Sequence, residues 1–179
     1  MADLNAFLAG WAPAAAEQWH WPTIEQDFDV NAYLTTLEPP LDLVVSVRAI
    51  ALRGDQVFVF ESEGQTHVVP GGRREPGEAP DAALIREIRE ETGCTIVGIP
   101  RRLAVLHLHN LSPQRHDPKY SYPYPDTLQW VFVAEVVGDA LPSDDPFVDN
   151  GRFVSADEAR RSITSSVERV LLDEAVASR

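Results

Sequence analysis

The chain has 179 residues, 44% of them hydrophobic, which is enough for one domain with a substantial core. Its formal net charge of −13 argues against binding along a DNA or RNA backbone, because that requires clustered Lys and Arg side chains. A small phosphorylated substrate is still compatible with this charge, since bound divalent cations supply local positive charge. The single cysteine excludes a disulfide within the chain and suits a reducing cytoplasm.

No stretch has the pattern of a targeting or membrane-spanning segment. The alanine-rich start contains Asp3 and no Lys or Arg, so it lacks the positive region of a signal peptide. The longest apolar run contains Asp42 and Arg48 and is too short to cross a bilayer. The sequence therefore predicts a cytoplasmic protein without membrane association.

Residues 1–40 form a tryptophan-rich segment that ends at Pro39-Pro40, where we expect a boundary with a domain over residues 41–179. Apolar residues at helical spacing predict that this extension is partly helical: Leu4, Phe7, Leu8 and Trp11. Three of the four tryptophans of the chain lie here. Such side chains should be buried, either against the chain's own core, which we favour slightly, or across a homodimer interface.

Two β-branched runs follow, over residues 41–53 and 57–61, separated by the turn signal Gly54-Asp55. This pattern predicts a hairpin at the centre of a sheet. The segment after it leads into a turn at Gly71-Gly72.

A helix is predicted next, over residues 80–92. Pro80 suits its first turn, Asp81 complements the positive end of the helix, and Gly93 supplies the stop. Residues on one side at helical spacing are expected to face the core: Leu84, Ile85, Ile88 and Thr92.

Glu87, Glu90 and Glu91 stand at i, i+3 and i+4 in this helix, which places their carboxylates on a neighbouring face. Like charges so placed repel each other, and oxygen-seeking divalent cations such as Mg²⁺ or Mn²⁺ would relieve the repulsion. Arg86 lies beside this face and is expected to pair with a carboxylate such as Glu78. Taken alone, the segment EIREE is better explained as a solvated acidic face.

The surrounding spacing changes that interpretation. It reads G-x5-E-x7-R-E-U-x-E-E-x-G-U, where U is a bulky apolar residue, and it resembles the Nudix box at every fixed position. The last position departs slightly, because Cys94 stands where the family usually has an aliphatic residue; a buried thiol behaves as a small hydrophobe. The matching residues are Gly72, Glu78, Arg86, Glu87, Ile88, Glu90, Glu91, Gly93 and Cys94.

The resemblance implies an α/β/α sandwich with a mixed β-sheet and hydrolysis of a nucleoside diphosphate linked to another moiety, by metal-assisted attack of water on phosphorus. It further implies that Glu87, Glu90 and Glu91 hold the Mg²⁺ or Mn²⁺ ions, that the carbonyl of Gly71 adds a ligand, and that Arg86 orients the carboxylates. Gly72, Glu78 and Gly93 would be structural. The cations would neutralise pyrophosphate charge and lower the pKa of a bound water.

Beyond the box, a strand is predicted within residues 95–110, with Leu103, Val105, His107 and His109 on one side and Ala104, Leu106 and Leu108 on the other. A His-x-His pair can bind zinc, but a polar sheet face or hydrogen-bonded histidines are favoured here, since no third ligand is evident. Contact of His107 and His109 with the phosphate or base of a substrate is a further possibility.

The segment LSPQRHDPKYSYPYPD connects this strand to the next and is rich in Pro, Tyr and cations. A long connection of this kind is often functional, although a Pro-stiffened surface loop is about as plausible. Stacking of tyrosine rings on a base and contact of cations with phosphate would make it a substrate-selecting loop. The residues in question are Arg115, Lys119, Tyr120, Tyr122 and Tyr124.

The last long strand is predicted over residues 127–137. Glu135 is its only acidic residue, so it should be paired or near metal, and the resemblance suggests a metal ligand or general base; a solvent-facing edge residue is the alternative. Ser155 and Glu158 then form a capping box, and residues 165–178 have the spacing of a helix that docks on the sheet.

Two other functions compete with hydrolysis. A nucleotide sensor of the same fold would be expected to carry a damaged box, and an isomerase of this fold would not need the full box. The substrate stays open between an oxidised nucleoside triphosphate, ADP-ribose, a dinucleoside polyphosphate and a nucleotide sugar, because specificity lies in loops.

Overall fold

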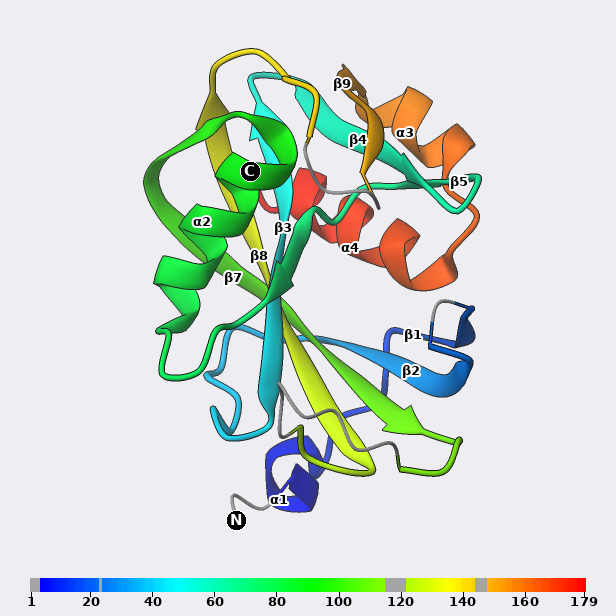
Figure 1. Ribbon diagram of the computed structural model, residues 1–179. Coiled ribbons are helices and arrows are strands. Elements are labelled where there is room, and N and C mark those ends of the chain that lie inside the picture. The colour runs from blue at the N-terminus through cyan, green and yellow to red at the C-terminus, as the bar shows by residue number, and fades with distance from the viewer. Residues whose placement is uncertain (1–3, 23, 115–121, 144–147) are drawn as a thin grey trace.

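The computed structural model describes residues 4–22, 24–114, 122–143 and 148–179. A nine-stranded mixed sheet lies between helices, with α2 on one side of the long central strands and α3 and α4 on the other (Figure 1). The expected α/β/α sandwich is confirmed. The elements are α1 (Leu4–Leu8), β1 (Ala15–Trp21), β2 (Gln26–Leu34), β3 (Val44–Arg53), β4 (Gln56–Ser62), β5 (Gln65–His67), β6 (Gly71–Arg73), α2 (Pro80–Thr92), β7 (Thr95–Asn110), β8 (Asp126–Val137), β9 (Asp149–Ser155), α3 (Ala156–Ser162) and α4 (Ser166–Ala177).

The sheet runs in the order β1-β2-β7-β8-β3-β4-β5, with β6 paired to β3 and β9 paired to β4. β3 and β8 are parallel, and the other pairs are antiparallel. The predicted hairpin is present as β3 and β4. Gly71 and Gly72, expected in a turn, instead pair with Arg48 and Val47 in the short strand β6, so the backbone that precedes α2 is held in the sheet.

Alternation along the strands divides the core into two layers. The α2-side core is formed by residues that include Val47, Phe58, Leu84, Ile88, Trp130 and Phe132. The α4-side core contains Ile50, Leu52, Leu106, Val133, Val167 and Leu171, among others. Because neighbouring residues of a strand point to opposite faces, one sheet serves both layers.

The first forty residues contain two strands that the helical pattern did not predict. β2 pairs with β7 and extends the sheet, and β1 pairs with β2. Phe28, Val30 and Ala32 are buried, so β2 carries the period-two signal of a strand. Only Leu4–Leu8 is helical in the described part of this segment. Trp19 and Trp21 pack against the α4-side core, whereas Trp11 is 40% exposed.

Helix α2 has the predicted bounds. Pro80 occupies its first turn, and Gly93 adopts a left-handed conformation (φ 74°) from which its N–H bonds the carbonyl of Arg89. Leu84 and Ile88 face the α2-side core, and Cys94 is buried, as expected. Ile85 is an exception, because its side chain is 56% exposed. Its position in the apolar row lies at the margin of the helix face that the sheet covers.

Strand β7 fills the whole range within which a strand was predicted, and its pairing with β8 has two irregularities, of which the second changes the facing of Leu103. The pairing with β8 shifts between Arg102 and Ala104. Leu103 consequently joins Ala104, Leu106 and Leu108 in the α4-side core, although strict alternation had placed it with Val105. A bulge inserts one extra residue and so reverses the facing of residues before it, which period-two reading cannot detect.

Both C-terminal helices begin at a capping serine. Ser155 Oγ accepts a hydrogen bond from the N–H of Glu158, as predicted, and Ser165 Oγ does the same for Glu168. α4 has an additional partner in Glu17 of β1, whose carboxylate accepts hydrogen bonds from the N–H of Ser166 and the hydroxyl of Ser165. Burial would raise the pKa of Glu17, but these bonds outweigh it and lower the pKa. No helix in the described ranges is long and apolar enough to cross a bilayer.

Glu168, which is buried, contacts the partly exposed His67, and this contact should make stability depend on pH. The Glu168 side chain is 3% exposed; its oxygens lie 2.6 Å from His67 Nδ1 and 2.8 Å from the N–H of Val68. Burial tends to lower the pKa of His67, but the contact with Glu168 raises it above the ordinary value. A raised folded-state pKa stabilises the protein fully below the unfolded pKa of about 6.5, and this stabilisation is lost as pH rises through the folded-state pKa.

We therefore expect the His67→Asn variant to be destabilised by about 2 kcal/mol near pH 6 and by about half of that near pH 9. Urea unfolding at both pH values measures the difference. His20→Asn is the matched control, because His20 contacts Asp27 at 2.8 Å on an exposed surface. Equal destabilisation of the His67 variant at both pH values would contradict the prediction.

Candidate metal and phosphate site

The site is built where α2 packs on strand β6, and Glu87 is one of its two buried carboxylates. A Cβ added to Gly72 would lie 2.5 Å from Glu87 Oε2, far inside van der Waals contact. Glycine at this position therefore lets the carboxylate approach the backbone of β6. Glu87 is 8% exposed, and burial raises its pKa despite the opposing charge of Arg86.

Glu91 is fixed to the same strand by a different contact. Its Oε2 accepts a hydrogen bond of 2.6 Å from the N–H of Gly71. Gly71 has a φ of 137°, and an added Cβ would meet the carbonyl oxygen of Val47 at 2.3 Å, so no other residue fits here. The carbonyl of Gly71, expected to be a metal ligand, accepts a hydrogen bond from Arg48 at 2.9 Å, which leaves its second lone pair for a cation.

Arg86 joins the carboxylates of this segment. It donates to both oxygens of Glu78, at 3.0 and 2.9 Å, and to the carbonyl of Arg73. Its Nη1 also donates to Glu87 at 2.7 Å and to Glu90 at 3.1 Å. The bonds to Glu78 and Glu87 raise the pKa of the guanidinium, and Arg86 in turn lowers the pKa of Glu78. The predicted Arg86–Glu78 pair is thus present.

The donor set fits a hard divalent cation. Arg86 Nη1 already bridges Glu87 and Glu90, so one positive centre stands between two of the three carboxylates. Within the described residues, however, Glu87, Glu90 and Glu91 do not bring one oxygen each within 4.8 Å of one another. The Glu90 side chain is 59% exposed, which leaves space for a change of rotamer that would bring its carboxylate to the other two. Carboxylate oxygens of this kind suit Mg²⁺ or Mn²⁺.

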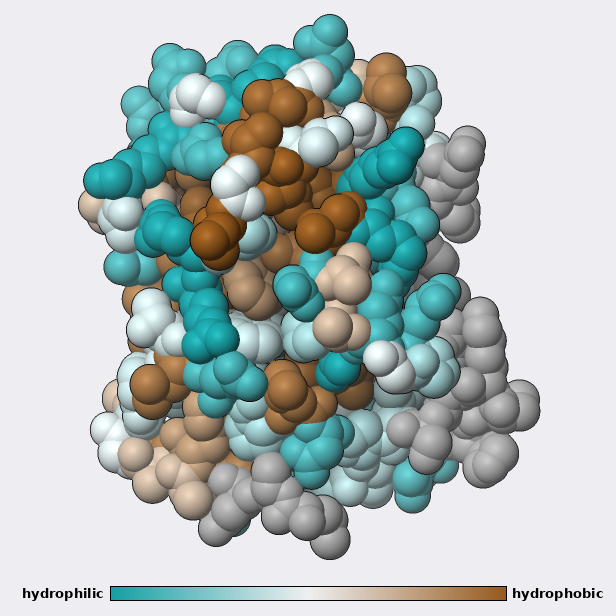
Figure 2. Space-filling view, turned by 90° about the vertical axis from the view of Figure 1, so that its left-hand side faces the viewer, coloured by the Kyte–Doolittle hydropathy of each residue, from teal (hydrophilic) through white to brown (hydrophobic). Residues whose placement is uncertain are grey.

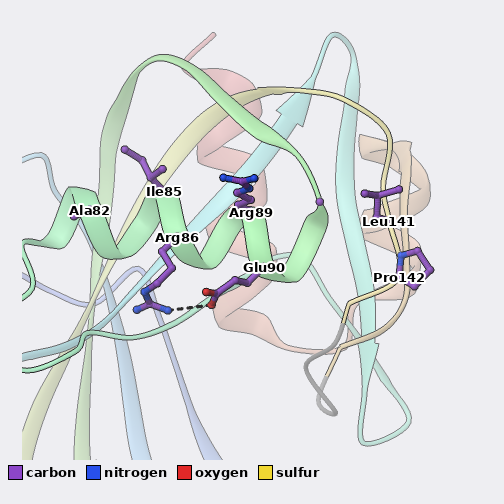
Figure 3. Close-up of a pocket in the computed structure, with 8 residues that line it drawn as sticks. Ala82, Ile85, Arg86, Arg89, Glu90, Leu141 and Pro142 are labelled. Atoms are coloured by element: carbon purple, nitrogen blue, oxygen red, sulfur yellow. Dashed lines mark hydrogen bonds and ion pairs between the residues drawn. The ribbon is translucent and has the colours of Figure 1, made fainter.

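The outer side of α2 borders an open depression of about 740 Å³. Figure 3 shows Ile85 and Arg86 pointing to different sides of the helix, with Glu90 turned toward Arg86. Figure 2 faces this side of the molecule and shows apolar side chains gathered in its upper half. The residues that line the depression are Ala82, Ile85, Arg86, Arg89, Glu90, Gly93, Leu141 and Pro142.

One end of the tyrosine-containing connection reaches the segment that holds the carboxylates. Arg73 of β6 donates to the hydroxyl of Tyr122 at 3.4 Å and lies over its ring. Tyr124 instead donates to the carbonyl of Ser112, within its own connection. Arg115, Lys119 and Tyr120, also predicted to select the substrate, lie outside the described residues.

His107 and His109 both contact Asp126, which the sequence had not indicated as a site residue. Asp126 Oδ1 lies 2.7 Å from His107 Nε2 and 2.8 Å from His109 Nδ1. The structure therefore contains the hydrogen-bonded histidines that the sequence interpretation favoured. Burial tends to raise the pKa of Asp126, but the two histidines lower it. Asp126 begins the next strand, and its distance along the chain concealed the contact.

A model of the NUDIX domain matches residues 42–173, nearly three quarters of the chain. The chain belongs to the Nudix family. The Nudix box thus corresponds to β6, α2 and the loop between them, and the carboxylates described above are those of the box.

Two curated relatives are pyrophosphate-cleaving enzymes by name. An ADP-ribose pyrophosphatase of Methanocaldococcus jannaschii is 29% identical over 121 residues, which cover 65% of this chain and 63% of the relative. An 8-oxo-dGTP diphosphatase of Escherichia coli is 33% identical over 58 residues, 30% of this chain and 45% of the relative. The matches therefore span less than two thirds of the length of either relative.

Solved Nudix structures share the fold. A Bacillus subtilis pyrophosphohydrolase, BsRppH, superposes with a TM-score of 0.60 at 17% identity over 90% of this chain and 97% of its own. The NUDIX domain of Shewanella oneidensis NrtR, crystallised with ADP ribose, gives 0.56 at 12% identity over 75% and 87%. At identities this low, the superpositions show a common fold and nothing more specific.

Glu135 stands apart from the Nudix box. Trp130, Phe132, Ala134 and Val136 of β8 belong to the α2-side core, so Glu135 points to the opposite face of the sheet. Its side chain is 53% exposed and lies 3.9 Å from Arg179. The structure therefore does not bring Glu135 together with the three carboxylates of the box.

Proposed function

We propose that this Nudix protein is a metal-dependent hydrolase that cleaves the pyrophosphate bond of a nucleoside diphosphate derivative or a nucleoside triphosphate by attack of water on phosphorus. The observation that carries the proposal is the complete box, in which two glycines fit Glu87 and Glu91 against β6 and Arg86 connects Glu87 with Glu90. The names of both curated relatives support this reaction class.

The residues of the box would have different roles in metal binding and catalysis. Glu87, Glu90 and Glu91 would hold Mg²⁺ or Mn²⁺, with the Gly71 carbonyl as a further ligand. When bound, the ions would neutralise pyrophosphate charge and acidify a bound water. Arg86 orients the carboxylates of Glu87 and Glu90, and Glu78 anchors Arg86 through both of its oxygens. Gly72 and Gly93 have structural roles, close approach and helix termination.

A release assay tests the activity. The wild-type protein is incubated with ADP-ribose, oxidised and normal nucleoside triphosphates, dinucleoside polyphosphates and nucleotide sugars, with Mg²⁺ or Mn²⁺ and with excess chelator. Turnover of one class that stops with chelator is the expected result, and it names the substrate. Binding of a nucleotide without turnover of any compound would instead identify a nucleotide sensor and overturn the proposal.

Tyr122 is proposed to contribute to substrate selection, because it lies against Arg73 of the box strand. The Tyr122→Ala variant is expected to lower kcat/KM on the best substrate about tenfold, since stacking of a base on an aromatic ring is worth about 1–3 kcal/mol. Tyr124→Ala is the control, because Tyr124 bonds the carbonyl of Ser112. Equal kcat/KM for wild type and the Tyr122 variant would remove Tyr122 from the substrate site.

A further inference from the structure

We propose that His107, His109 and Asp126 form a second metal site, separate from the Nudix box, which binds a divalent transition metal of the zinc class. The three residues come from two adjacent antiparallel strands, β7 and β8, near the connection that joins them. Each offers one ligand atom, and the three atoms lie within 4.8 Å of one another. In the described part of the chain, no other set of three His, Cys, Asp or Glu side chains converges in this way.

The register of the sheet explains why the ligands meet. His109 lies directly opposite Asp126, and His107 is opposite Leu128, two residues further along β8. Directly opposed residues point to the same face, and residues two apart on a strand do so as well. Both histidines and Asp126 therefore share the sheet face that holds Val105 and Trp130 of the α2-side core.

The observed distances are close to those of a filled site. Zinc bonds of about 2.0–2.2 Å in a tetrahedron would set ligand atoms roughly 3.3 Å apart. Asp126 Oδ1 now lies 2.7 and 2.8 Å from the two ring nitrogens, so about half an ångström of separation would admit an ion. The side chains are 14%, 43% and 32% exposed for His107, His109 and Asp126, which leaves room for this adjustment and for water as a fourth ligand.

The donor types distinguish this site from the box. Two imidazoles and one carboxylate suit Zn²⁺, Co²⁺ or Ni²⁺, whereas the oxygen donors of Glu87, Glu90 and Glu91 suit Mg²⁺ or Mn²⁺. The metal would bind the ring nitrogens that face Asp126 Oδ1, and the single proton of each neutral ring would then sit on the other nitrogen. It would also join the end of β7 to the start of β8 on either side of their long connection.

The molecule contains a matched comparison. His20 lies 2.8 Å from Asp27 across the β1–β2 pair, the same contact as that of His109 with Asp126. In the described chain it belongs to no group of three potential ligands. A histidine–aspartate pair alone should bind Zn²⁺ weakly, because zinc sites in proteins have three or four protein ligands.

The test is a titration with Zn²⁺ by calorimetry, and with Co²⁺ by visible absorption, in the presence of excess Mg²⁺ and in the Glu90→Gln background. We expect one strong Zn²⁺ site per chain, a Co²⁺ spectrum typical of nitrogen ligation, and a Zn²⁺-dependent rise in Tm. His109→Gln and Asp126→Asn should each weaken Zn²⁺ binding about 100-fold or more, because even outer-shell changes cost about 10–100-fold. His20→Gln should bind like the parent protein.

Several results would overturn the proposal. These are no Zn²⁺ binding in the parent protein, unchanged binding in His109→Gln, or binding lost equally in His20→Gln. The metal-free variants are compared by circular dichroism, and if Asp126→Asn does not fold, the 43% exposed His109 still provides the decisive variant. None of these readouts depends on turnover, so failure of the zinc site and failure of the proposed hydrolysis are separate outcomes.

Discussion

The Glu90→Gln variant is expected to lose at least about 100-fold in kcat while its Tm stays within about 1 °C of the wild type, because it removes a metal-holding charge from an exposed side chain. The Glu90 side chain is 59% exposed, and its described side-chain contact is an ion pair with Arg86 across one helical turn. Such exposed pairs contribute about 0.3–0.5 kcal/mol, so the fold should not depend on it.

Glu91→Gln makes the matching comparison, since the same chemical change at Glu91 should affect folding as well as turnover. Glu91 is 6% exposed, and its carboxylate accepts a charge-assisted hydrogen bond from the N–H of Gly71. We expect similar loss of kcat and an additional loss of about 1–2 kcal/mol in the free energy of unfolding. Assays at saturating substrate, with urea unfolding of both variants, separate the two effects. Near-normal turnover of Glu90→Gln would exclude Glu90 from the metal site.

Replacement of Arg86 by Met is expected to have the largest effect on stability, about 3–5 kcal/mol, because it leaves a buried carboxylate without its partner. Arg86 donates five hydrogen bonds, to Glu78, Glu87, Glu90 and the carbonyl of Arg73. Glu87 is 8% exposed, so water cannot replace the lost guanidinium fully. The Met side chain keeps most of the apolar stem of Arg86 and limits the change to the charged group.

Arg86→Lys is the control for charge alone. A lysine ammonium is a point donor and cannot reproduce the planar fork that spans Glu78 and Glu87, so about half of the loss should persist. Addition of Mg²⁺ should stabilise the Met variant more than the wild type, because the cation would supply the missing positive charge. Unfolding curves of both variants that coincide with the wild type would show that Arg86 does not hold the carboxylates.

The elements that could be predicted from the sequence are those specified by local signals. The bounds of α2 follow from Pro80 and Gly93, and the contact of Arg86 with Glu78 follows from the spacing of the box. Contacts between distant segments could not be predicted in the same way. Asp126 meets the histidines only through the register of β7 and β8, and Leu103 changes sides through a bulge.

Glu135 illustrates the same limit. A lone acid in an apolar run is a sound signal for a partner, but the face to which it points depends on the phase of the strand. Trp130, Phe132, Ala134 and Val136 take the side of the box, which turns Glu135 toward Arg179 at the other face. For β2, by contrast, the sequence does contain a usable signal, which the helical interpretation of residues 1–40 missed. Phe28, Val30 and Ala32 alternate as the buried residues of a strand.

The bond from Glu17 to the start of α4 has a consequence for the order in which the protein folds on the ribosome. Ser166 lies 149 residues after Glu17, so the two can meet only after almost the whole described chain has left the exit tunnel. Until then, the sheet face that α4 covers would be exposed, and the first hairpin would be held at the sheet edge by the pairing of β2 with β7 but without the bonds of Glu17 to α4. We infer that synthesis of the last helix completes the fold in a late, concerted step, and that nascent chains ending before α4 are the species on which chaperones would act.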